Sequence, residues 1–513
     1  MSFNGRTLAS QANNVGSIPI TRSRFQPLGP RALLRGLLVF RCLCLLWVLA
    51  LAAWPARATP DQMWAALQRA GISPDQISLM AQPVDGGVPL LAHNESRAFT
   101  LASTTKLVTS LAALDQLGPK FRWQTRAYLL GPLHQGVLEG DLLIVGGGNA
   151  RLSAEDLRGW FGQMQQKGLH TIRGNIILNR GAFQTRASDH AGTPVPSSAN
   201  PHHAWPEAFV LDEGTITVDI HASAASVDLQ MSPRLDGVTF LNLLKVKKVK
   251  CSALKQPVTA SFEELYQPPR ILVQGDWAPG CSPTRLTIAT LPGSRFAPMA
   301  VSAAWRDAGG VLDGLVMQPE SAYAMVNLAR SHKPFAVHES ARLGSLLRDM
   351  NKWSNNLMAR HLMLSMSRGF PARPATLTEA RQRMAQWLTK QGLGRADLSL
   401  DNGSGLSHDE RGKAQALVQL LRKAWSGPHA QALMQSLPVA GQDGTLSNRL
   451  TQSSARGKAF LKTGTLVDTR SLAGYVQGRS GRTYAVVAII NDPKATKGVP
   501  ALDAFIEWIV DNG

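Results

Sequence analysis

The spacing of hydrophobic residues along the front of the chain indicates two helices with a hairpin between them. Residues 61–71 and 99–118 carry apolar side chains at intervals of three and four, as an amphipathic helix does. Residues 76–95 alternate between apolar and polar side chains around Asp85-Gly86-Gly87, which favours a β-hairpin. Gly118-Pro119 then provides a stop signal for the second helix.

After residue 120 the pattern changes to short apolar strands separated by Gly and Pro turns, and helical spacing returns after residue 318. The middle stretch, 121–318, predicts one or two β-rich domains with a helix at 154–167. The later stretch predicts three helical segments, three antiparallel strands and a closing helix: 339–366, 375–392, 414–425, 458–466, 471–478, 483–492 and 501–510. We therefore predict one α/β (α+β) domain, 59–120 plus 319–513, split by an insertion at 121–318.

Composition places the chain among globular proteins. With 513 residues, 44% hydrophobic and 17% charged, it is long enough for two or three domains and is not a disordered sequence. The net charge is +19, of which seven arginines in residues 1–58 supply seven, leaving +12 (19 − 7) for the rest. This surplus suits contact with an anionic polymer or peripheral contact with a membrane, and a well-solvated basic surface explains it equally well. No interleaving of basic and aromatic residues indicates nucleic-acid binding.

Residues 1–58 have the pattern of a leader with a signal peptide. A positively charged start is followed by an apolar run and by Ala56-Arg57-Ala58, a cleavage signature. The uninterrupted apolar run, from Cys42 to Trp54, is too short to span a bilayer comfortably. A retained N-terminal anchor is the alternative, and Arg41 within the longer stretch argues against it. We predict cleavage after Ala58 and an exported protein.

Cleavage would leave two of the four cysteines, Cys251 and Cys281. In an oxidising compartment they could form one disulfide. Two free buried thiols are the alternative, because the sequence does not give the distance between them.

Ser103 and Lys106 stand at the head of the second predicted helix and are the first candidates for catalysis. Positions i and i+3 share one face of a helix, so the amine can reach the hydroxyl. A serine hydroxyl needs a base, and desolvation or nearby cations can lower the pKa of a lysine until its amine is neutral. A helix N-terminus also directs backbone N–H groups at an oxyanion formed there.

A Ser-x-x-Lys motif is weak by itself, since a chain of this length should hold roughly one by chance. A second one occurs at Ser252-Ala-Leu-Lys255, in a basic run just before Pro257. No amphipathic helix follows that would hold the two residues on one face. We interpret this second motif as part of a surface strand.

Two further motifs lie in the back of the chain. Ser354 and Asn356 form a Ser-x-Asn motif at the entry to an apolar helix. Lys462-Thr463-Gly464 lies on a predicted edge strand, where the lysine would add positive field, the threonine could bind a carboxylate and the glycine would let a substrate backbone approach. Taken singly, the first motif is more often a helix cap or surface polarity and the second a turn.

The order Ser-x-x-Lys, Ser-x-Asn, Lys-Thr-Gly is that of penicillin-binding proteins and serine β-lactamases. The gap of 251 residues from Ser103 to Ser354 (354 − 103) is far longer than in a compact β-lactamase. With the segments STTK, KWSNNLMAR, DNGSGLS and LKTGTL, it resembles the D-alanyl-D-alanine carboxypeptidase/endopeptidase family of class C low-molecular-mass penicillin-binding proteins, the penicillin-binding protein 4 type. The resemblance covers residues 59–513.

The resemblance implies a serine β-lactamase/transpeptidase-like domain with two smaller β-rich domains inserted after the nucleophile helix. It implies a hydrolase acting on peptidoglycan stem peptides that end in D-Ala-D-Ala and on the cross-links between stems. The leader predicts that this hydrolase is periplasmic, and we expect no cofactor or metal. β-Lactam antibiotics would be covalent inhibitors. The histidines show no metal-site spacing such as HExxH.

The resemblance also implies roles for the motif residues. Three would be catalytic and four would bind substrate: Ser103, Lys106 and Ser354; Asn356, Lys462, Thr463 and Thr465. The first serine would attack the carbonyl of the penultimate D-Ala after losing its proton to Lys106. Ser354, with Lys462, would relay a proton to the leaving amine. Asn356 would hold the substrate amide, the two threonines would bind the terminal carboxylate, and the backbone N–H groups of Ser103 and Thr465 would form the oxyanion hole.

Two alternatives stay open at this point. A serine β-lactamase shares the nucleophile and the lysine, but no deacylating glutamate stands out in the sequence. A non-catalytic peptidoglycan-binding scaffold would have no reason to keep all of Ser103, Lys106, Ser354, Asn356 and Lys462.

Overall fold

The computed structural model describes residues 60–190, 204–222, 227–290, 294–319 and 332–513. The predicted leader, its cleavage site and the alternative N-terminal anchor, all within residues 1–58, lie outside this part of the chain. Within the described residues no helix combines the length and the apolar character that a membrane crossing needs.

A five-stranded antiparallel sheet joins the front and the back of the chain. Its order is β2-β1-β23-β22-β21, with bounds Leu91–His93, Ile77–Pro83, Thr483–Asn491, Thr469–Gln477 and Ala459–Thr465. Strand β1 pairs with β23 from Ile77↔Ile490 to Pro83↔Tyr484, so chain segments some 400 residues apart share one sheet. The predicted hairpin and the three predicted C-terminal strands are confirmed, and β21 is an edge strand.

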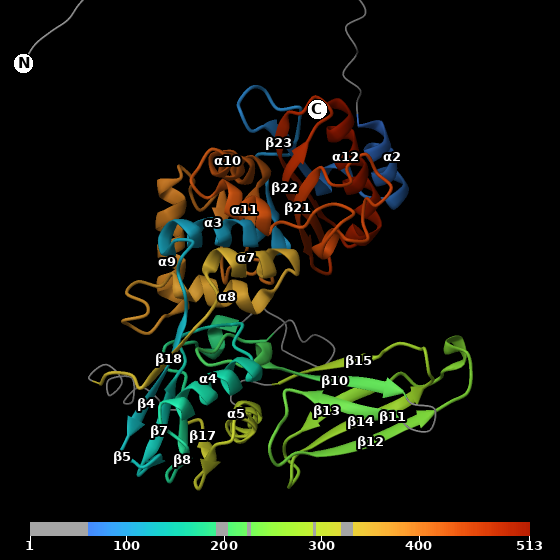
Figure 1. The fold of residues 1–513 in the computed structure, drawn as a ribbon. Coiled ribbons are helices and arrows are strands. Elements are labelled where there is room, and N and C mark those ends of the chain that lie inside the picture. The colour runs from blue at the N-terminus through green and yellow to red at the C-terminus, as the bar shows by residue number, and fades with distance from the viewer. Residues whose placement is uncertain (1–59, 191–203, 223–226, 291–293, 320–331) are drawn as a thin grey trace, which may run out of the picture. The chain divides into compact units, whose positions relative to one another are not determined.

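Side chains alternate between the two faces of a strand, and in this sheet both faces carry apolar residues. Helices therefore cover both faces. On one face Val486, Ala488 and Ile490 of β23 pack with α2 (Asp61–Ala70) and α12 (Val499–Asn512). On the other face Ala485, Val487 and Ile489 pack with a helical layer (Figure 1): α3 (Thr105–Leu117), α7 (Leu343–Lys352), α8 (Asn356–Ser365), α9 (Leu377–Lys390), α10 (Ala414–Trp425) and α11 (Ala430–Ser436). The split α/β domain predicted from the sequence is confirmed.

The helix expected for residues 99–118 begins later than predicted. Ala98–Thr100 form the short strand β3, Ala102–Thr104 form a 3₁₀ turn, and α3 follows from Thr105. From Thr105 to Leu114 its polar side chains are buried along with its apolar ones, because α7, α8 and the segment around Gly403 cover them. This buried part of the helix is a rigid base for the residues at its N-terminus.

The helical segment that the sequence predicts for residues 339–366 is broken in the structure. Helix α7 ends at Lys352 and α8 begins at Asn356. Between them Ser354 has φ +58°, a left-handed conformation that non-glycine residues rarely adopt. The hydrophobic pattern continues through this turn, so it gave no sign of the break.

The first part of the insertion contains helices as well as strands. Its two sheets have the orders β17-β9-β7-β4-β18 and β16-β8-β6-β5. The strands are Gln124–Leu130 (β4), Leu133–His134 (β5), Val137–Leu138 (β6), Asp141–Val145 (β7), Thr171–Ile172 (β8), Ile176–Asn179 (β9), Val311–Leu312 (β16), Val316–Met317 (β17) and Ala336–Glu339 (β18). Helix α4 (Ala154–Gln166), which the sequence predicts, packs against α5 (Phe296–Asp307), which it does not.

The second part of the insertion is built from strands. Two three-stranded sheets have the orders β11-β10-β15 and β12-β14-β13: Val227–Ser232, Thr215–Ala222 and Arg285–Ala289; Thr239–Val246, Arg270–Trp277 and Thr259–Glu263. Cys251 and Cys281 form a disulfide, which decides between the two alternatives. Ser252 lies in an exposed 3₁₀ turn, Cys251–Ala253, so the prediction of a strand there is wrong although the surface location is right.

The limits of the insertion, 121 and 318, stay a prediction. Strand β18, Ala336–Glu339, pairs antiparallel with β4 and so extends the sheet of the inserted region beyond residue 318. The chain enters the helical layer of the split domain with α7.

Candidate active site

The Ser-x-x-Lys motif forms a direct contact. Ser103 lies in the 3₁₀ turn that precedes α3, and Lys106 lies in the first turn of that helix. The Nζ atom of Lys106 is 2.8 Å from the Oγ atom of Ser103. Ser103 is partly exposed whereas Lys106 has no exposed surface, so solvent reaches the hydroxyl and not the amine.

The surroundings of Lys106 favour a neutral amine. Its Nζ atom is also within hydrogen-bonding distance of Asn356 Oδ1, at 2.7 Å, and of the carbonyl oxygen of Ser404. Burial, and after it the positive charge of Lys462, lower the pKa of Lys106 well below its usual value of 10.5, while Glu410 opposes the shift. A neutral amine beside a hydroxyl is the arrangement that general-base activation of a serine needs.

Ser354 and Lys462 form a second pair. The Nζ atom of Lys462 donates to Ser354 Oγ at 2.8 Å and to the carbonyl oxygen of Thr463 at 2.8 Å. Lys462 is buried on β21, and burial lowers its pKa to about 7. The left-handed turn between α7 and α8 directs the Ser354 hydroxyl toward this amine.

Asn356 links the two pairs. It is the first residue of α8, and its side chain contacts Lys106 rather than capping its own helix. Asn355 provides the cap, since its Oδ1 atom accepts from the backbone N–H of Met358 at 2.9 Å. The motif therefore lies at a helix start, but the capping residue is Asn355 and neither Ser354 nor Asn356.

The remaining motif residues lie along the edge strand β21. Thr463 donates through Oγ1 to Oγ1 of Thr445 at 2.8 Å, and Thr465 is exposed at the end of the strand. Gly464 is needed for a reason that the sequence did not indicate. A Cβ atom there would overlap Ser471 Oγ and press on Ala102. The glycine is therefore needed so that β21 can lie close to the 3₁₀ turn that carries Ser103, and not so that a substrate can approach β21.

Sequence reasoning missed Glu410, which organises the segment 401–405. Its buried carboxylate accepts backbone N–H groups of four residues: Asp401, Asn402, Gly403 and Gly405. The segment in turn presents the Ser404 carbonyl to Lys106. Burial raises the pKa of Glu410 to about 7. The motif DNGSGLS marked this segment, but nothing in the sequence tied it to a carboxylate three residues further on.

Arg360 was also missed. It is buried on α8, and its Nη1 atom donates to the carbonyl oxygen of Ala204 at 3.2 Å. Among the described residues, its buried Nε and Nη2 atoms have no hydrogen-bond partner. Burial lowers its pKa to about 10, and its charge contributes to the lowered pKa of Lys106. The site therefore lies in a positive field suited to an anionic substrate group.

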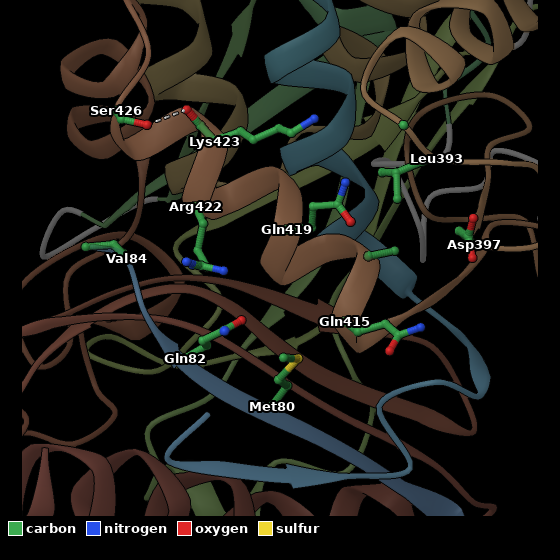
Figure 2. A pocket seen from close by; sticks show the side chains of 12 residues that line it. Met80, Gln82, Val84, Leu393, Asp397, Gln415, Gln419, Arg422, Lys423 and Ser426 are labelled. Carbon is green, nitrogen blue, oxygen red and sulfur yellow. Dashed lines mark hydrogen bonds between the residues drawn. The ribbon is translucent and has the colours of Figure 1, made fainter. Parts of the chain in front are cut away.

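A separate cavity of about 770 Å³ contains none of these residues. Figure 2 shows its lining, which comes from β1, α10 and the segment before β19 (Leu398–Ser399), including Gln82, Gln419 and Arg422. Among the residues that the structure describes, no group of three or more His, Cys, Asp or Glu side chains could hold a metal ion.

Comparison with protein families finds a match over nearly the whole described chain. The model of the D-Ala-D-Ala carboxypeptidase 3 (S13) family matches residues 61–508. D-alanyl-D-alanine carboxypeptidase DacB from Haemophilus influenzae is 24% identical over 81% of this chain and 85% of its own. A D-alanyl-D-alanine carboxypeptidase from Actinomadura sp. (strain R39) is 29% identical over 77% of this chain and 72% of its own.

Comparison with solved structures shows the same fold. The crystal structure of penicillin binding protein 4 (dacB) from Haemophilus influenzae superposes with a TM-score of 0.69 at 21% identity, covering 87% of this chain and 99% of that one. The same protein complexed with a novel β-lactam gives 0.64 at 22% identity, covering 84% and 95%. At these identities the likeness describes the fold.

Proposed function

The chain belongs to the D-Ala-D-Ala carboxypeptidase 3 (S13) family, and on that premise we propose that it is a serine-type D-Ala-D-Ala carboxypeptidase and/or endopeptidase acting through an acyl-enzyme on Ser103. The substrates are peptidoglycan stem peptides ending in D-Ala-D-Ala and the cross-links between stems. One observation carries the proposal: the buried amine of Lys106 lies 2.8 Å from Ser103 Oγ and 2.7 Å from Asn356, in contact with two of the three motifs.

Acylation begins with the transfer of the Ser103 hydroxyl proton to the neutral amine of Lys106. The Oγ atom bonds to the carbonyl carbon of the penultimate D-Ala, and the negative charge that develops on the carbonyl oxygen is met by the backbone N–H groups of Ser103 and Thr465. The serine precedes a buried helix whose N-terminal dipole supports that charge.

Collapse of the tetrahedral intermediate breaks the C–N bond and requires a proton on the leaving amine. The Ser354 hydroxyl, 2.8 Å from Lys462, relays that proton from the lysine ammonium. Asn356 holds the substrate amide, while Thr463 and Thr465 bind the terminal carboxylate in the field of the buried cations. Water then hydrolyses the ester: its proton passes through Ser354 to the neutral Lys462, and Lys106 returns a proton to Ser103 Oγ, which restores the site and releases the shortened stem.

A β-lactam enters the same path as far as the ester. Opening of its ring leaves the leaving group attached, so the acyl-enzyme persists. The likeness to a relative whose structure was solved with a β-lactam supports this part of the proposal.

The proposal is tested by intact-mass and peptide-mapping mass spectrometry of the purified protein after treatment with penicillin. We expect one adduct, on the peptide that contains Ser103, that persists for minutes or longer, and release of D-Ala from a D-Ala-D-Ala-terminated peptide. An adduct on another residue would contradict the catalytic assignment. Rapid turnover of nitrocefin without a lasting adduct would instead identify a β-lactamase, and the absence of both adduct and D-Ala release would indicate a scaffold.

We also propose that the enzyme works in the periplasm after cleavage behind Ala58, as the leader pattern and the cell-wall family support. Mass spectrometry of the protein from a periplasmic fraction should find Thr59 as its first residue. Recovery of the chain with residues 1–58 still attached, in the membrane fraction, would favour the retained anchor. Peripheral contact of the basic surface with the membrane would appear there as salt-dependent release of the cleaved chain.

A further inference from the structure

Helix α8, which begins within the Ser-x-Asn motif, is contacted by the inserted region at its N-cap and at two residues in its middle. Asn355 donates through Nδ2 to Oε2 of Glu213 at 2.6 Å. Arg360 donates to the carbonyl oxygen of Ala204, and Nδ1 of His361 lies 2.8 Å from the carbonyl oxygen of Gly148. The contact nearest to the chemistry is that of Glu213, since Asn355 separates Ser354 from Asn356.

The turn that carries Glu213 is strained. Asp212 and Glu213 have φ angles of +44° and +58°, and Gly214 follows at +69°. Two successive non-glycine residues in the left-handed region cost roughly 1–3 kcal/mol each and persist only where the surroundings hold them. Here Asp212 accepts the backbone N–H of Ala154 at 3.1 Å through its carboxylate and the hydroxyl of Thr215 at 2.7 Å through its carbonyl oxygen.

On the other side of the contact, both ends of the Asn355 amide are engaged. Its oxygen caps α8 and its nitrogen donates to Glu213, so the side chain can neither flip nor turn away. Arg151, also in the inserted region, pairs with Oε1 of Glu213 and lies 3.9 Å from Asp349 of α7. Glu213 therefore contacts the start of α8 and Arg151 contacts α7, the helices after and before the left-handed turn at Ser354.

We propose that Glu213 is a positioning residue of the inserted region: it fixes the Asn355 amide and thereby holds the turn that presents Ser354 and Asn356 to the reacting groups. The strained turn at 212–214 sets the position of the Glu213 carboxylate, and the hydrogen bond of 2.6 Å to that carboxylate sets the position of the Asn355 amide. Arg151 orients the carboxylate. Because Glu213 and Arg151 are partly exposed, the geometry of the hydrogen bond matters here more than the strength of the ion pair.

The test rests on the proposed function for its assay, the rate of acylation by a fluorescent penicillin. Glu213→Ala should lower the second-order rate constant of acylation roughly 10- to 100-fold, since small displacements of reacting groups have effects of that size. Its melting temperature should stay within about 2 °C of the wild type. Glu213→Gln, which keeps an acceptor oxygen for Asn355, should retain most of the rate. Asp313→Ala, which removes an exposed ion pair with Arg173 elsewhere in the insertion, is the matched control and should leave the rate unchanged.

A double-mutant cycle separates positioning from a general structural effect. If Glu213 acts through Asn355, the Glu213→Ala change should have little further effect in an Asn355→Ala background. Additive losses, or a wild-type rate for Glu213→Ala, would overturn the proposal. Failure of the proposed function is recognised separately, because the wild type would then show no acylation. In that case amide hydrogen exchange at residues 353–358 decides: faster exchange in Glu213→Ala supports the positioning role of Glu213, and unchanged exchange refutes it.

Discussion

The split α/β domain and the inserted region differ in where they place charge. In the described part of the chain four basic side chains are buried, Lys106, Lys352, Arg360 and Lys462, and all of them lie in the split domain. Within the described residues of 121–318 no lysine or arginine is buried, and ion pairs such as Arg285–Asp219 are exposed at the cation. The core of the inserted region consists of apolar side chains from α4, α5 and the sheets.

This difference in buried basic side chains indicates that the reacting groups lie in the split domain. Burying a cation without a matched anion costs stability, and such groups are retained where a shifted pKa is useful. Near the nucleophile there are three buried basic side chains, Lys106, Arg360 and Lys462, and one buried carboxylate, Glu410. The inserted region shows the ordinary arrangement of a stable module, closed by the disulfide between Cys251 and Cys281. Changes in the first region should therefore alter catalysis, and changes in the second, apart from the contact of Glu213 with Asn355, should alter stability.

Removing the nucleophile should have the largest effect. We expect Ser103→Ala to abolish labelling by penicillin and to lower D-Ala release by a factor of at least about 10⁴, because no other hydroxyl among the described residues contacts the Nζ atom of Lys106. Ser252→Ala alters the other Ser-x-x-Lys, in the exposed turn of the insertion, and should change nothing. Both rates are measured with the melting temperature as a check on folding. Labelling that persists in Ser103→Ala would exclude it as the nucleophile.

The two buried lysines should produce a bell-shaped dependence of kcat/KM on pH. Lys106 must be neutral to accept a proton, so activity rises with pH through its lowered pKa. Lys462 must be protonated to donate, so activity falls above its pKa of about 7. Lys462→Arg keeps the charge at all accessible pH values and should move the falling limb to higher pH, with a loss of roughly 10-fold or more at the optimum. A rate that continues to rise through pH 9 in the wild type would contradict this assignment.

Glu410→Gln should have a smaller effect that differs in kind. The carboxylate raises the pKa of Lys106, so its loss should lower that pKa and shift the rising limb of the pH profile to lower pH. Because the folded pKa of Glu410, about 7, exceeds its usual value of 4.5, the folded wild type binds more protons between these values and should lose stability as pH rises from 4.5 to 7. Denaturation of Glu410→Gln over that window should lack this decline. Identical profiles for the two proteins would refute the role of Glu410.

Breaking the disulfide should have the smallest effect on catalysis. Cys251→Ser with Cys281→Ser should lower the unfolding free energy by roughly 2–4 kcal/mol, because the unfolded chain gains freedom. Acylation by penicillin should stay within about twofold of the wild type, since the contacts of Ser103, Lys106 and Ser354 lie in the other region. Denaturant titration and labelling kinetics measure the two quantities, and a large loss of labelling would show that the two regions are not separable in this way.

Much of the fold follows from local pattern, and the exceptions have identifiable causes. The hairpin at 77–93, the three C-terminal strands and the helix at 154–166 are visible as periods of two or about 3.6. Helix α5 was missed because its alanine-rich segment follows a run of strands and Pro-rich turns. The break at Ser354 was missed because the apolar pattern continues through it, while the left-handed turn is held by contacts from β21 and the inserted region.

For the site, sequence order indicated Ser103, Lys106, Ser354, Asn356 and Lys462, since each belongs to a motif of defined chemistry. Glu410, Ser404 and Glu213 could not be found in this way. They act through a backbone carbonyl or through contacts to main-chain and amide groups, which many residue types could make and which leave no spacing rule.

By itself, the sequence determined which elements form and which side chains can react, because hydrophobic period and residue chemistry are local properties. Only the tertiary structure decided that the amine of Lys106 contacts Asn356, which lies 250 residues further along the chain. It also decided the protonation of that amine, since desolvation and the field of neighbouring charges arise only when the chain is packed.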